Sequence, residues 1–398
     1  MLSITDADKM IHQNMPSYPD ETIPLDEAYG RLLREDITAD RDFPPFDKSL
    51  MDGIAIDISS WEMGNRRFPI EDTQAAGTAQ LTLPHSDACI EIMTGAVVPN
   101  GANCVVPIEY FENDGGLAII DDSYPLELYK NIRRQGADQQ QGNVLIKAGC
   151  RIGTPQIAVC AAVGKSQIKV AACPQVAIIS TGDEVVEIDQ AVKPYQIRQS
   201  NAHFMKIALD QTRLVTAERF HFPDDKDLLL KEIANILNRF DILVLTGGVS
   251  MGKFDFVPQV LQELGCEVLF HKVQQKPGKP FWFGLSKSKQ PIFALPGNPV
   301  STQVGIYRHV IPNIQSALGL TPKKEYAVLT EDVRLDTKFA FFLTVSLTST
   351  QAGIIEAKPV LTGGSGDFAS VAESDGFIEI PAETNELKKG FIGTVYRW

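Results

Sequence analysis

Clusters of glycine, hydroxyl and charged residues follow three short apolar runs in the middle of the chain. "STGDE" comes directly after "QVAII", "TGGVSMGKFD" after "DILVL", and "LPGNP" after "PIFA". Continuous apolar runs of this length are typical of strands that are buried on both faces of a parallel sheet. In such sheets ligands bind just outside the carboxyl ends of the strands. We therefore expect the three loops to converge on one crevice.

The second loop holds two adjacent glycines, Gly247 and Gly248. Because glycine adopts positive φ readily, this pair can turn several backbone N–H groups into one concavity. With the positive end of the next helix, such a concavity suits a phosphate or another anion. Ser250 and Lys253 favour this function. The alternative is a strand-to-helix turn in which the glycines serve only the backbone shape.

The third loop begins a predicted helix. Asn298 can cap a helix whose first residue is Pro299, a position where the missing N–H of proline costs nothing. Gly297 lets the backbone approach a ligand closely. Helix initiation alone is the alternative.

The segment "KPGKP" places Lys276 and Lys279 around a tight Pro-Gly turn in an acidic chain. A rigid turn fixes both ammonium groups near one point, which suits phosphate, molybdate or a similar oxyanion. A solvated basic turn is the alternative.

Several carboxylates lie near the ends of predicted strands or helices. Asp183 and Glu184 adjoin the end of the first apolar run, where neighbouring carboxylates could hold Mg²⁺, which prefers oxygen ligands and shares them with phosphates. Caps or surface charges are the alternative. Asp224 and Asp255 each precede a segment of helical periodicity, so each is either an N-cap or a contact to a ligand or metal.

A second group of polar residues lies upstream. Asp52 in "SLMDGIAI" and Thr94 in "IMTGAVV" read as turn residues when taken alone. In "NIRRQGAD", Arg133 and Arg134 can bind an anion and Asp138 adds a carboxylate, although paired arginines commonly form a solvated face. No HExxH, CxxC, GxSxG or GxxxxGK[ST] motif occurs, and nothing supplies an obvious nucleophile.

The elements that must position these residues change along the chain. Residues 3–35 have helical spacing, the next hundred residues have short alternating stretches broken by Gly, Pro and Asn, and strands alternate with amphipathic segments between 173 and 320. We predict an α/β multidomain protein with a central doubly wound α/β domain. The predicted parts are an N-terminal helical and linker region (1–40 with 140–172), a β-rich insert (41–139), the α/β domain (173–320) and a C-terminal β barrel-like domain (321–398).

Composition excludes several classes of protein. The 398 residues are 44% hydrophobic and carry a net charge of −13, which disfavours a nucleic-acid surface because phosphate binding needs clustered Lys and Arg. No apolar run approaches the ~18 residues of a membrane span. Six scattered cysteines form no CxxC pair and favour a reducing compartment. We expect a cytoplasmic protein that binds neither nucleic acid nor membrane.

Taken in order, these segments resemble the MoeA family of molybdopterin molybdenumtransferases, whose eukaryotic relatives include the E domain of gephyrin. The resemblance implies a MogA-like, molybdopterin-binding α/β domain and an elongated homodimer. It also implies insertion of molybdenum from molybdate into adenylylated molybdopterin, with release of AMP and a requirement for a divalent cation such as Mg²⁺. A molybdopterin adenylyltransferase and molybdoenzyme apoproteins or chaperones would be its partners. The resemblance is carried by "SLMDGIAI", "IMTGAVVPNGANCVVPIE", "NIRRQGAD", "IISTGDEV", "TGGVSMGKFDFV", "KPGKP" and "LPGNPVS".

The resemblance implies site residues at the positions of this chain that match the family's motifs. It also implies that residues of the insert face the α/β loops of a partner chain. Acidic and polar residues that resemble the catalytic set are Asp52, Thr94, Asp138, Glu184, Asp224 and Asp255, with Asp183 and Glu184 as expected Mg²⁺ ligands. Residues that resemble the anion and substrate contacts are Gly247, Gly248, Ser250, Lys276, Lys279, Pro296, Gly297, Asn298, Pro299, Arg133, Arg134 and Ser365.

The chain departs from the family pattern at a few positions. Thr344 stands near the place of a common arginine, so no pterin contact is carried over there, and Gln199 and Asn103 replace other residue types. Two other functions are compatible with parts of the sequence. One is molybdopterin adenylyltransferase, which resembles the α/β domain alone, and the other is a gephyrin-like scaffold without catalysis. The sequence does not distinguish molybdate from tungstate.

Overall fold

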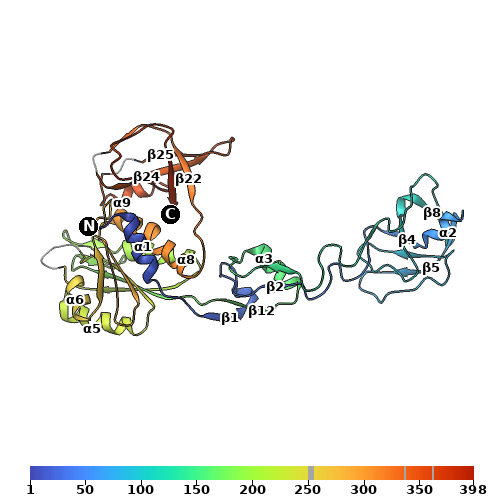
Figure 1. Ribbon diagram of the computed structural model, residues 1–398, viewed down its shortest axis with the longest axis horizontal. Coiled ribbons are helices and arrows are strands. Elements are labelled where there is room, and N and C mark those ends of the chain that lie inside the picture. Colours follow the sequence, from blue (N-terminus) through green and yellow to red (C-terminus); the bar gives the residue numbers. More distant parts are fainter. Residues whose placement is uncertain (250–254, 336–337, 361–362) are drawn as a thin grey trace. The chain divides into compact units, whose positions relative to one another are not determined.

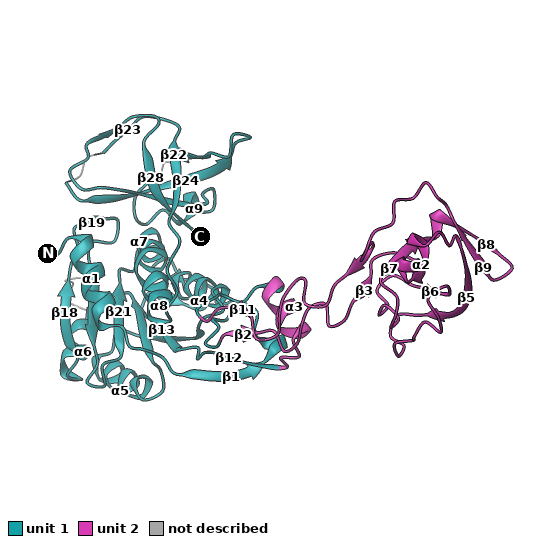
Figure 2. Ribbon diagram, turned by 45° about the vertical axis from the view of Figure 1, so that its right-hand side comes forward, with its two compact units in different colours: residues 1–35, 149–154, 167–398 teal, residues 36–148, 155–166 magenta. Residues whose placement is uncertain are grey.

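The computed structural model describes residues 1–249, 255–335, 338–360 and 363–398. The described chain forms two compact units, which Figure 2 shows in different colours. The first unit comprises residues 1–35, 149–154 and 167–398, and the second comprises residues 36–148 and 155–166.

A six-stranded sheet forms the centre of the first unit (Figure 1). Its first four strands are parallel, the fifth runs antiparallel to both of its neighbours, and the sixth has the direction of the first four. Alternate residues of each strand face opposite sides of the sheet, so Ile178 and Ala177 enter two different cores. Across the sheet the strands are β16 (Thr216–Phe222), β13 (Gln175–Thr181), β17 (Ile242–Thr246), β21 (Pro291–Leu295), β20 (Trp282–Leu285) and β18 (Glu267–His271).

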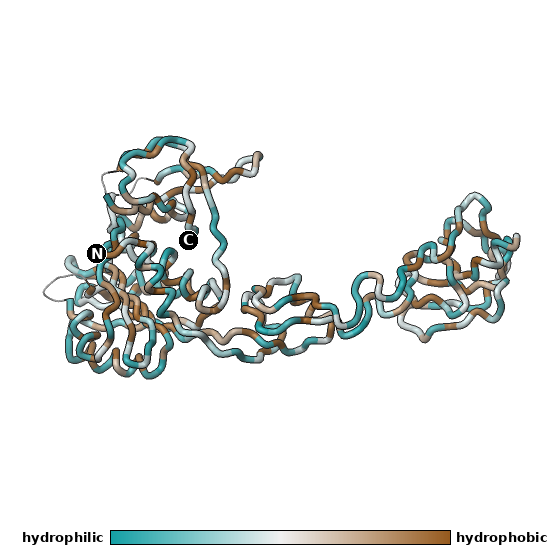
Figure 3. Tube along the Cα trace, viewed as in Figure 1, coloured by the Kyte–Doolittle hydropathy of each residue, from teal (hydrophilic) through white to brown (hydrophobic). Residues whose placement is uncertain are grey.

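Helices cover both faces of this sheet, which confirms the predicted doubly wound α/β domain. Figure 3 shows apolar segments running through the strands and hydrophilic segments at the periphery of the unit. One face carries α1 (Ile4–Asn14), α4 (Asn201–Gln211), α7 (Pro299–Val304), the π-helix η3 (Gly305–Val310) and α8 (Ile311–Ala317), and the other carries α5 (Lys226–Leu237) and α6 (Val257–Glu263).

Helix α1 follows from its sequence. Ser3 accepts a hydrogen bond from the N–H of Asp6 (3.1 Å) and caps the helix, which contributes about 1 kcal/mol. Ile4, Ala7 and Ile11 recur at the helical spacing and are buried in the core. The predicted first helix is confirmed.

The helical structure predicted from the spacing of residues 3–35 is wrong for residues 24–33. The chain there forms strand β1 (Asp20–Pro24) and a short 3₁₀ turn, η1 (Leu25–Glu27). Gly30 then adopts φ +84°, which interrupts helical backbone geometry, and β1 pairs with β12 (Gln167–Ala171). Partners distant in sequence therefore override the local periodicity.

The C-terminal strands close into a five-stranded barrel with its own core, which includes Val345, Ile378 and Val395. The barrel strands are β22 (Glu325–Leu329), β24 (Ala340–Ser349), β25 (Ile355–Pro359), β26 (Gly376–Ile380) and β28 (Ile392–Arg397). Shorter elements of this unit are β14 (Val185–Val186), β15 (Ile197–Arg198), β19 (Gln275–Lys276), β23 (Val333–Arg334), β27 (Glu386–Leu387) and α9 (Phe368–Val371).

The second unit is built on another six-stranded sheet, as expected for the β-rich insert. Its order is β7 (Cys104–Pro107), β4 (Gly53–Ile56), β6 (Cys89–Ile92), β5 (Arg67–Gln74), β9 (Leu117–Ile120) and β8 (Phe111–Asp114). The remaining elements are β2 (Ile37–Thr38), β3 (Lys48–Ser49), α2 (Ile58–Glu62), η2 (Ile108–Tyr110), β10 (Ile132–Arg133), β11 (Val144–Ile146) and α3 (Thr154–Ala162), whose first residue belongs to the other unit. No helix in the described ranges is long and apolar enough to cross a membrane.

Candidate functional site

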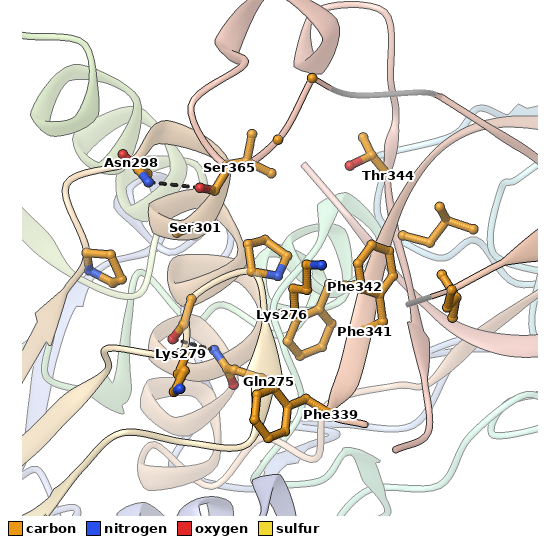
Figure 4. A pocket seen from close by; sticks show the side chains of 18 of the residues that line it. Gln275, Lys276, Lys279, Asn298, Ser301, Phe339, Phe341, Phe342, Thr344 and Ser365 are labelled. Atoms are coloured by element: carbon orange, nitrogen blue, oxygen red, sulfur yellow. Dashed lines mark hydrogen bonds between the residues drawn. The ribbon is translucent and has the colours of Figure 1, made fainter. Parts of the chain in front are cut away.

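The first unit contains the α/β sheet and is therefore called the α/β unit. Its first cavity has a volume of about 720 Å³ and lies between the Lys276–Pro280 turn and the barrel (Figure 4). Lys276 and Lys279 are both exposed on one side of it. Phe341 and Thr344 of the barrel line the other side. The cavity therefore combines two ammonium groups with a partly apolar wall.

The lysine turn is held by its neighbours. Strand β19 pairs with β24, so Gln275 lies opposite Ala340 and Lys276 opposite Phe341. The Nζ of Lys279 lies 5.4 Å from the centroid of the Phe339 ring, which gives a cation–π contact. Among the described residues neither lysine has a carboxylate within ion-pair distance. Their charge is available to an anion in the cavity.

Asn298 and Ser365 close another side of the first cavity. Asn298 occupies the predicted N-cap position and Pro299 the first turn of α7, but the Asn298 side chain does not cap the helix. Its Nδ2 donates instead to Ser365 Oγ at 2.8 Å (Figure 4). Helix initiation alone therefore does not account for Asn298.

The second cavity has a volume of about 610 Å³ and lies at the carboxyl ends of β13 and β17. The strand order reverses between these two strands, which is where ligands bind in open α/β sheets. Glu184, Gly247 and Phe368 are among its lining residues. Gly297 and Asn298 line both cavities, so the two spaces adjoin at this turn.

The paired glycines have a clear steric role. Gly247 and Gly248 have φ values of +89° and +61°. A β-carbon at Gly247 would lie 2.7 Å from the Thr181 carbonyl oxygen, and one at Gly248 would lie 2.7 Å from Thr181 Oγ1. Backbone shape thus requires glycine at both positions, and the anion-binding function stays a prediction. Ser250 lies outside the described residues.

Three carboxylates gather at the ends of β13 and β16. Asp183 Oδ1 accepts a hydrogen bond from the backbone N–H of Asp224 (3.0 Å). Burial raises the pKa of Asp224, and the negative charges of Asp183 and Glu184 raise it further. Among the residues that the structure describes, no group of three or more His, Cys, Asp or Glu is arranged to hold a metal on its own.

The capping alternatives for Asp224 and Asp255 are wrong. The N-cap of α5 is Asp225, whose side chain accepts from the N–H of Leu228 (3.0 Å). The N-cap of α6 is Phe256, which makes no side-chain capping bond. A ligand or metal contact stays a prediction for both carboxylates.

This difference predicts opposite effects of two adjacent substitutions. Asp225→Ala should lower the free energy of unfolding by about 1 kcal/mol because it removes the cap of α5. Asp224→Asn should leave the free energy of unfolding at pH 7 unchanged or raise it. The raised pKa of Asp224 means that its charge disfavours folding at neutral pH, and this penalty disappears as the pH falls through the raised value. Urea unfolding at pH 7 measures both variants, and equal losses would contradict the assignment.

Asp52 and Thr94 meet in the second unit. Asp52 Oδ1 accepts from the backbone N–H of Thr94 (2.6 Å) and from Thr94 Oγ1 (2.9 Å). The backbone bond lowers the pKa of Asp52 most, and the hydroxyl bond lowers it further. The structure therefore joins two residues that are distant in sequence and keeps the carboxylate charged.

Thr94→Val should raise the pKa of Asp52 toward that of an unbonded aspartate. The isosteric change removes the Oγ1 donor and retains the backbone N–H. A carboxyl ¹³C titration by NMR measures the shift, and Thr94→Ser serves as the control that keeps the hydroxyl. An unchanged titration in Thr94→Val would refute the contribution of the hydroxyl.

The two predicted arginines already have partners in the second unit. Arg133 forms an ion pair with Asp138. Arg134 pairs with Asp47 (3.0 Å) and stacks over Tyr129, with the guanidinium carbon 3.8 Å from the ring centroid. An anion that bound either arginine would have to compete with these carboxylates.

Two of the departures from the family pattern, Gln199 and Asn103, make specific hydrogen bonds. The buried Gln199 donates to Ser180 Oγ (2.6 Å) and accepts from Arg219 (3.1 Å) beside the second cavity. In the second unit Asn103 Oδ1 accepts from the backbone N–H of Ile58 (2.7 Å). The structure also reveals lining residues that the sequence analysis missed, namely Phe339 and Phe341 in the first cavity and Phe368 in the second.

Three family models match successive segments of the chain. Residues 2–164 match "MoeA N-terminal region (domain I and II)", residues 177–316 match "Probable molybdopterin binding domain", and residues 326–396 match "MoeA C-terminal region (domain IV)". Together these matches extend over most of both units.

Relatives match over the whole length. A molybdopterin molybdenumtransferase of Synechocystis is 34% identical over 399 residues and covers 100% of both chains. One from Bacillus subtilis is 32% identical, over 93% of this chain and 88% of its own. A crystal structure of a molybdopterin biosynthesis MoeA protein from Pyrococcus horikoshii has a TM-score of 0.85 at 30% identity, with 100% and 99% coverage.

Proposed function

This chain belongs to the MoeA family, and from that premise we propose that it is a molybdopterin molybdenumtransferase. The enzyme inserts molybdenum from molybdate into adenylylated molybdopterin and releases AMP and molybdenum cofactor. The family match includes the second unit and the barrel as well as the α/β domain. This extent favours the transferase over an adenylyltransferase built from the α/β domain alone.

The adjoining cavities support an assignment of each substrate to one cavity. The two cavities of the α/β unit share Gly297 and Asn298, so ligands in them would be neighbours. The first cavity, with Lys276 and Lys279, takes the oxyanion. The second cavity, at the strand reversal, takes the adenylylated pterin. Molybdate then lies next to the group that receives its metal.

The protein residues act by positioning and by charge. Lys276 and Lys279 offset the negative charge of molybdate, and the bonded pair of Asn298 and Ser365 orders the cavity wall between the two ligands. Holding the two reactants together removes the entropy cost of their encounter, and the lysine ammonium groups offset the repulsion between the two anions. The reaction consequently needs no covalent protein intermediate, which agrees with the lack of an obvious nucleophile in the sequence.

The acidic cluster suits a divalent cation. Burial raises the pKa of Asp224 most and the negative charges of Asp183 and Glu184 raise it further, and a cation would offset these charges. Mg²⁺ is commonly held by one or two carboxylates together with substrate phosphates, so three protein ligands are not required. Asp183 and Glu184 would hold the ion, which when bound would neutralise charge on the adenylyl phosphate.

We extend the proposal to a cytoplasmic homodimer. The six cysteines are free, which fits a reducing compartment. Leu50 and Met51, which directly precede Asp52, are exposed, as is Ile108, whose N–H donates to the Asp52 carbonyl at 3.0 Å. An apolar rim of this kind around a charged site supports burial against a second copy. A molybdopterin adenylyltransferase would supply the substrate, and apoproteins or chaperones would receive the product.

AMP release tests the proposed function. The purified protein is incubated with adenylylated molybdopterin and Mg²⁺, with and without molybdate, and AMP is quantified. We expect AMP release that depends on molybdate. Release at the same rate without molybdate would reject the coupling of metal insertion to nucleotide release.

A further inference from the structure

A buried hydrogen-bonded chain leads from the core to the lysine turn. His309, on the π-helix η3, is fully buried, and its Nε2 lies 2.9 Å from Oε1 of Gln275. Nε2 of Gln275, which is also buried, donates to the carbonyl oxygen of Gly278 at 3.1 Å. Gly278 lies between Lys276 and Lys279 in the turn. The imidazole thus reaches the turn through a single amide side chain.

The bonds fix the direction of this chain. The Gln275 amide donates through Nε2 to a carbonyl, so its oxygen must accept from His309, whose Nε2 therefore carries the hydrogen. His309 Nδ1 lies 3.5 Å from Asp8 Oδ1 and has no hydrogen-bond partner in the described part of the chain. Burial lowers the pKa of His309, which favours this neutral form.

Ion pairs fix the backbone beside His309, at the buried end of this hydrogen-bonded series. Arg308 donates to both carboxylate oxygens of Asp8 (3.0 and 2.8 Å) and to Glu379 of the barrel (2.8 Å). Tyr396 Oη also donates to Glu379 (2.9 Å). Paired and fully bonded charges of this kind hold a fixed geometry. Arg308, which directly precedes His309, is therefore held between α1 and the barrel.

Backbone hydrogen bonds from Val273 (3.1 Å) and Phe281 (2.9 Å) to the Lys279 carbonyl oxygen hold the end of the turn, and the Gln275 amide holds its middle. Its strand, β19, contributes only two residues to the pairing with β24. A β-carbon on Gly278 would lie 2.8 Å from Gln275 Nε2, so the amide packs directly beneath the turn. Figure 4 shows the hydrogen bond of the Gln275 amide as a dashed line. The amide therefore supports the segment that carries both ammonium groups.

We propose that His309 is a positioning residue for the oxyanion site, acting through Gln275 to hold the Lys276–Lys279 turn in its binding geometry. The proposal rests on the proposed function of the first cavity. If the amide loses its partner, it can rotate away from Gly278, and the backbone that carries both lysines loses this support. Affinity for the oxyanion should then fall, while binding of the adenylylated pterin in the second cavity should not.

Enzyme kinetics of four variants test the proposal. His309→Leu and Gln275→Met should each raise the KM for molybdate by about tenfold, the effect of about 1.4 kcal/mol of lost binding. The KM for adenylylated molybdopterin should stay unchanged. His309→Gln, which can still donate to Gln275, should restore the KM for molybdate to within about threefold of wild type. Asn313→Leu is the matched control, because Asn313 is also buried and donates to the backbone carbonyl of His309 (2.7 Å) rather than to its imidazole.

The double variant of His309→Leu and Gln275→Met should be no worse than either single variant, because both break the same chain. An unchanged KM for molybdate in both single variants, with an active wild type, would overturn the proposal, as would an equal rise in Asn313→Leu. If His309→Leu does not fold, Gln275→Met and His309→Gln decide the matter by the same measurement. A wild-type protein without molybdate-dependent AMP release would instead reject the proposed function.

Discussion

Replacing both lysines of the turn, Lys276→Ala with Lys279→Ala, should reduce molybdate-dependent AMP release by at least about 100-fold at low molybdate. Two unit charges 4 Å apart interact by about 4 kcal/mol at the effective dielectric constant of a protein surface, so loss of two cations is costly. Steady-state kinetics at varied molybdate measures the effect. We expect most of it in the KM for molybdate.

Lys289→Ala is the control for the lysine variants, because Lys289 also belongs to the α/β unit and is an exposed cation paired with Glu267 (3.0 Å). It should leave the kinetics unchanged, since exposed ion pairs contribute little. If the double lysine variant kept a normal KM for molybdate, the first cavity would not be the oxyanion site.

Glu184→Ala should abolish molybdenum insertion, with a loss of about 10³-fold, while the protein stays folded. The carboxylate is exposed, lines the second cavity and belongs to the acidic cluster, so its loss removes an expected Mg²⁺ ligand and little packing. Turnover is measured across a Mg²⁺ titration, with circular dichroism as the check on folding.

Glu218→Ala is the control for the Glu184 variant. Glu218 lies on the edge strand β16, is exposed, and pairs with Arg239 (3.3 Å). We expect normal turnover from this variant. Normal turnover from Glu184→Ala as well would remove Glu184 from the catalytic set.

The fold class could be predicted because the strand and helix patterns of the α/β domain are local. Ala177 and Ile178 belong to one continuous apolar run, which a two-sided sheet requires. The same local reasoning failed at residues 24–33, where β1 finds its partner in β12, more than a hundred residues away. Sequence spacing alone does not reveal that pairing.

The part of the candidate site formed by loops at strand ends could be predicted from the sequence. The part formed by residues that tertiary packing brings from distant segments could not. The loops that carry Glu184, Gly247 and Gly297 do converge on one cavity. The barrel wall with Phe341 was not foreseen, because it reaches the lysine turn only through tertiary packing. Which of two adjacent aspartates caps α5 also depends on backbone geometry, and the structure selects Asp225.

His309 illustrates the same limit. The sequence shows six scattered histidines, and nothing in their spacing distinguishes this one. Its importance appears only when Gln275 and Asp8, which come from distant parts of the chain, are seen on its two sides.

We propose that adjoining cavities hold the oxyanion and the nucleotide on either side of the Gly297–Asn298 turn. A crystal soaked with AMP and tungstate tests it most directly, because tungsten is located by its anomalous scattering. We expect tungstate beside Lys276 and Lys279, with AMP in the second cavity. Tungstate bound away from both lysines, with AMP outside the second cavity, would contradict it.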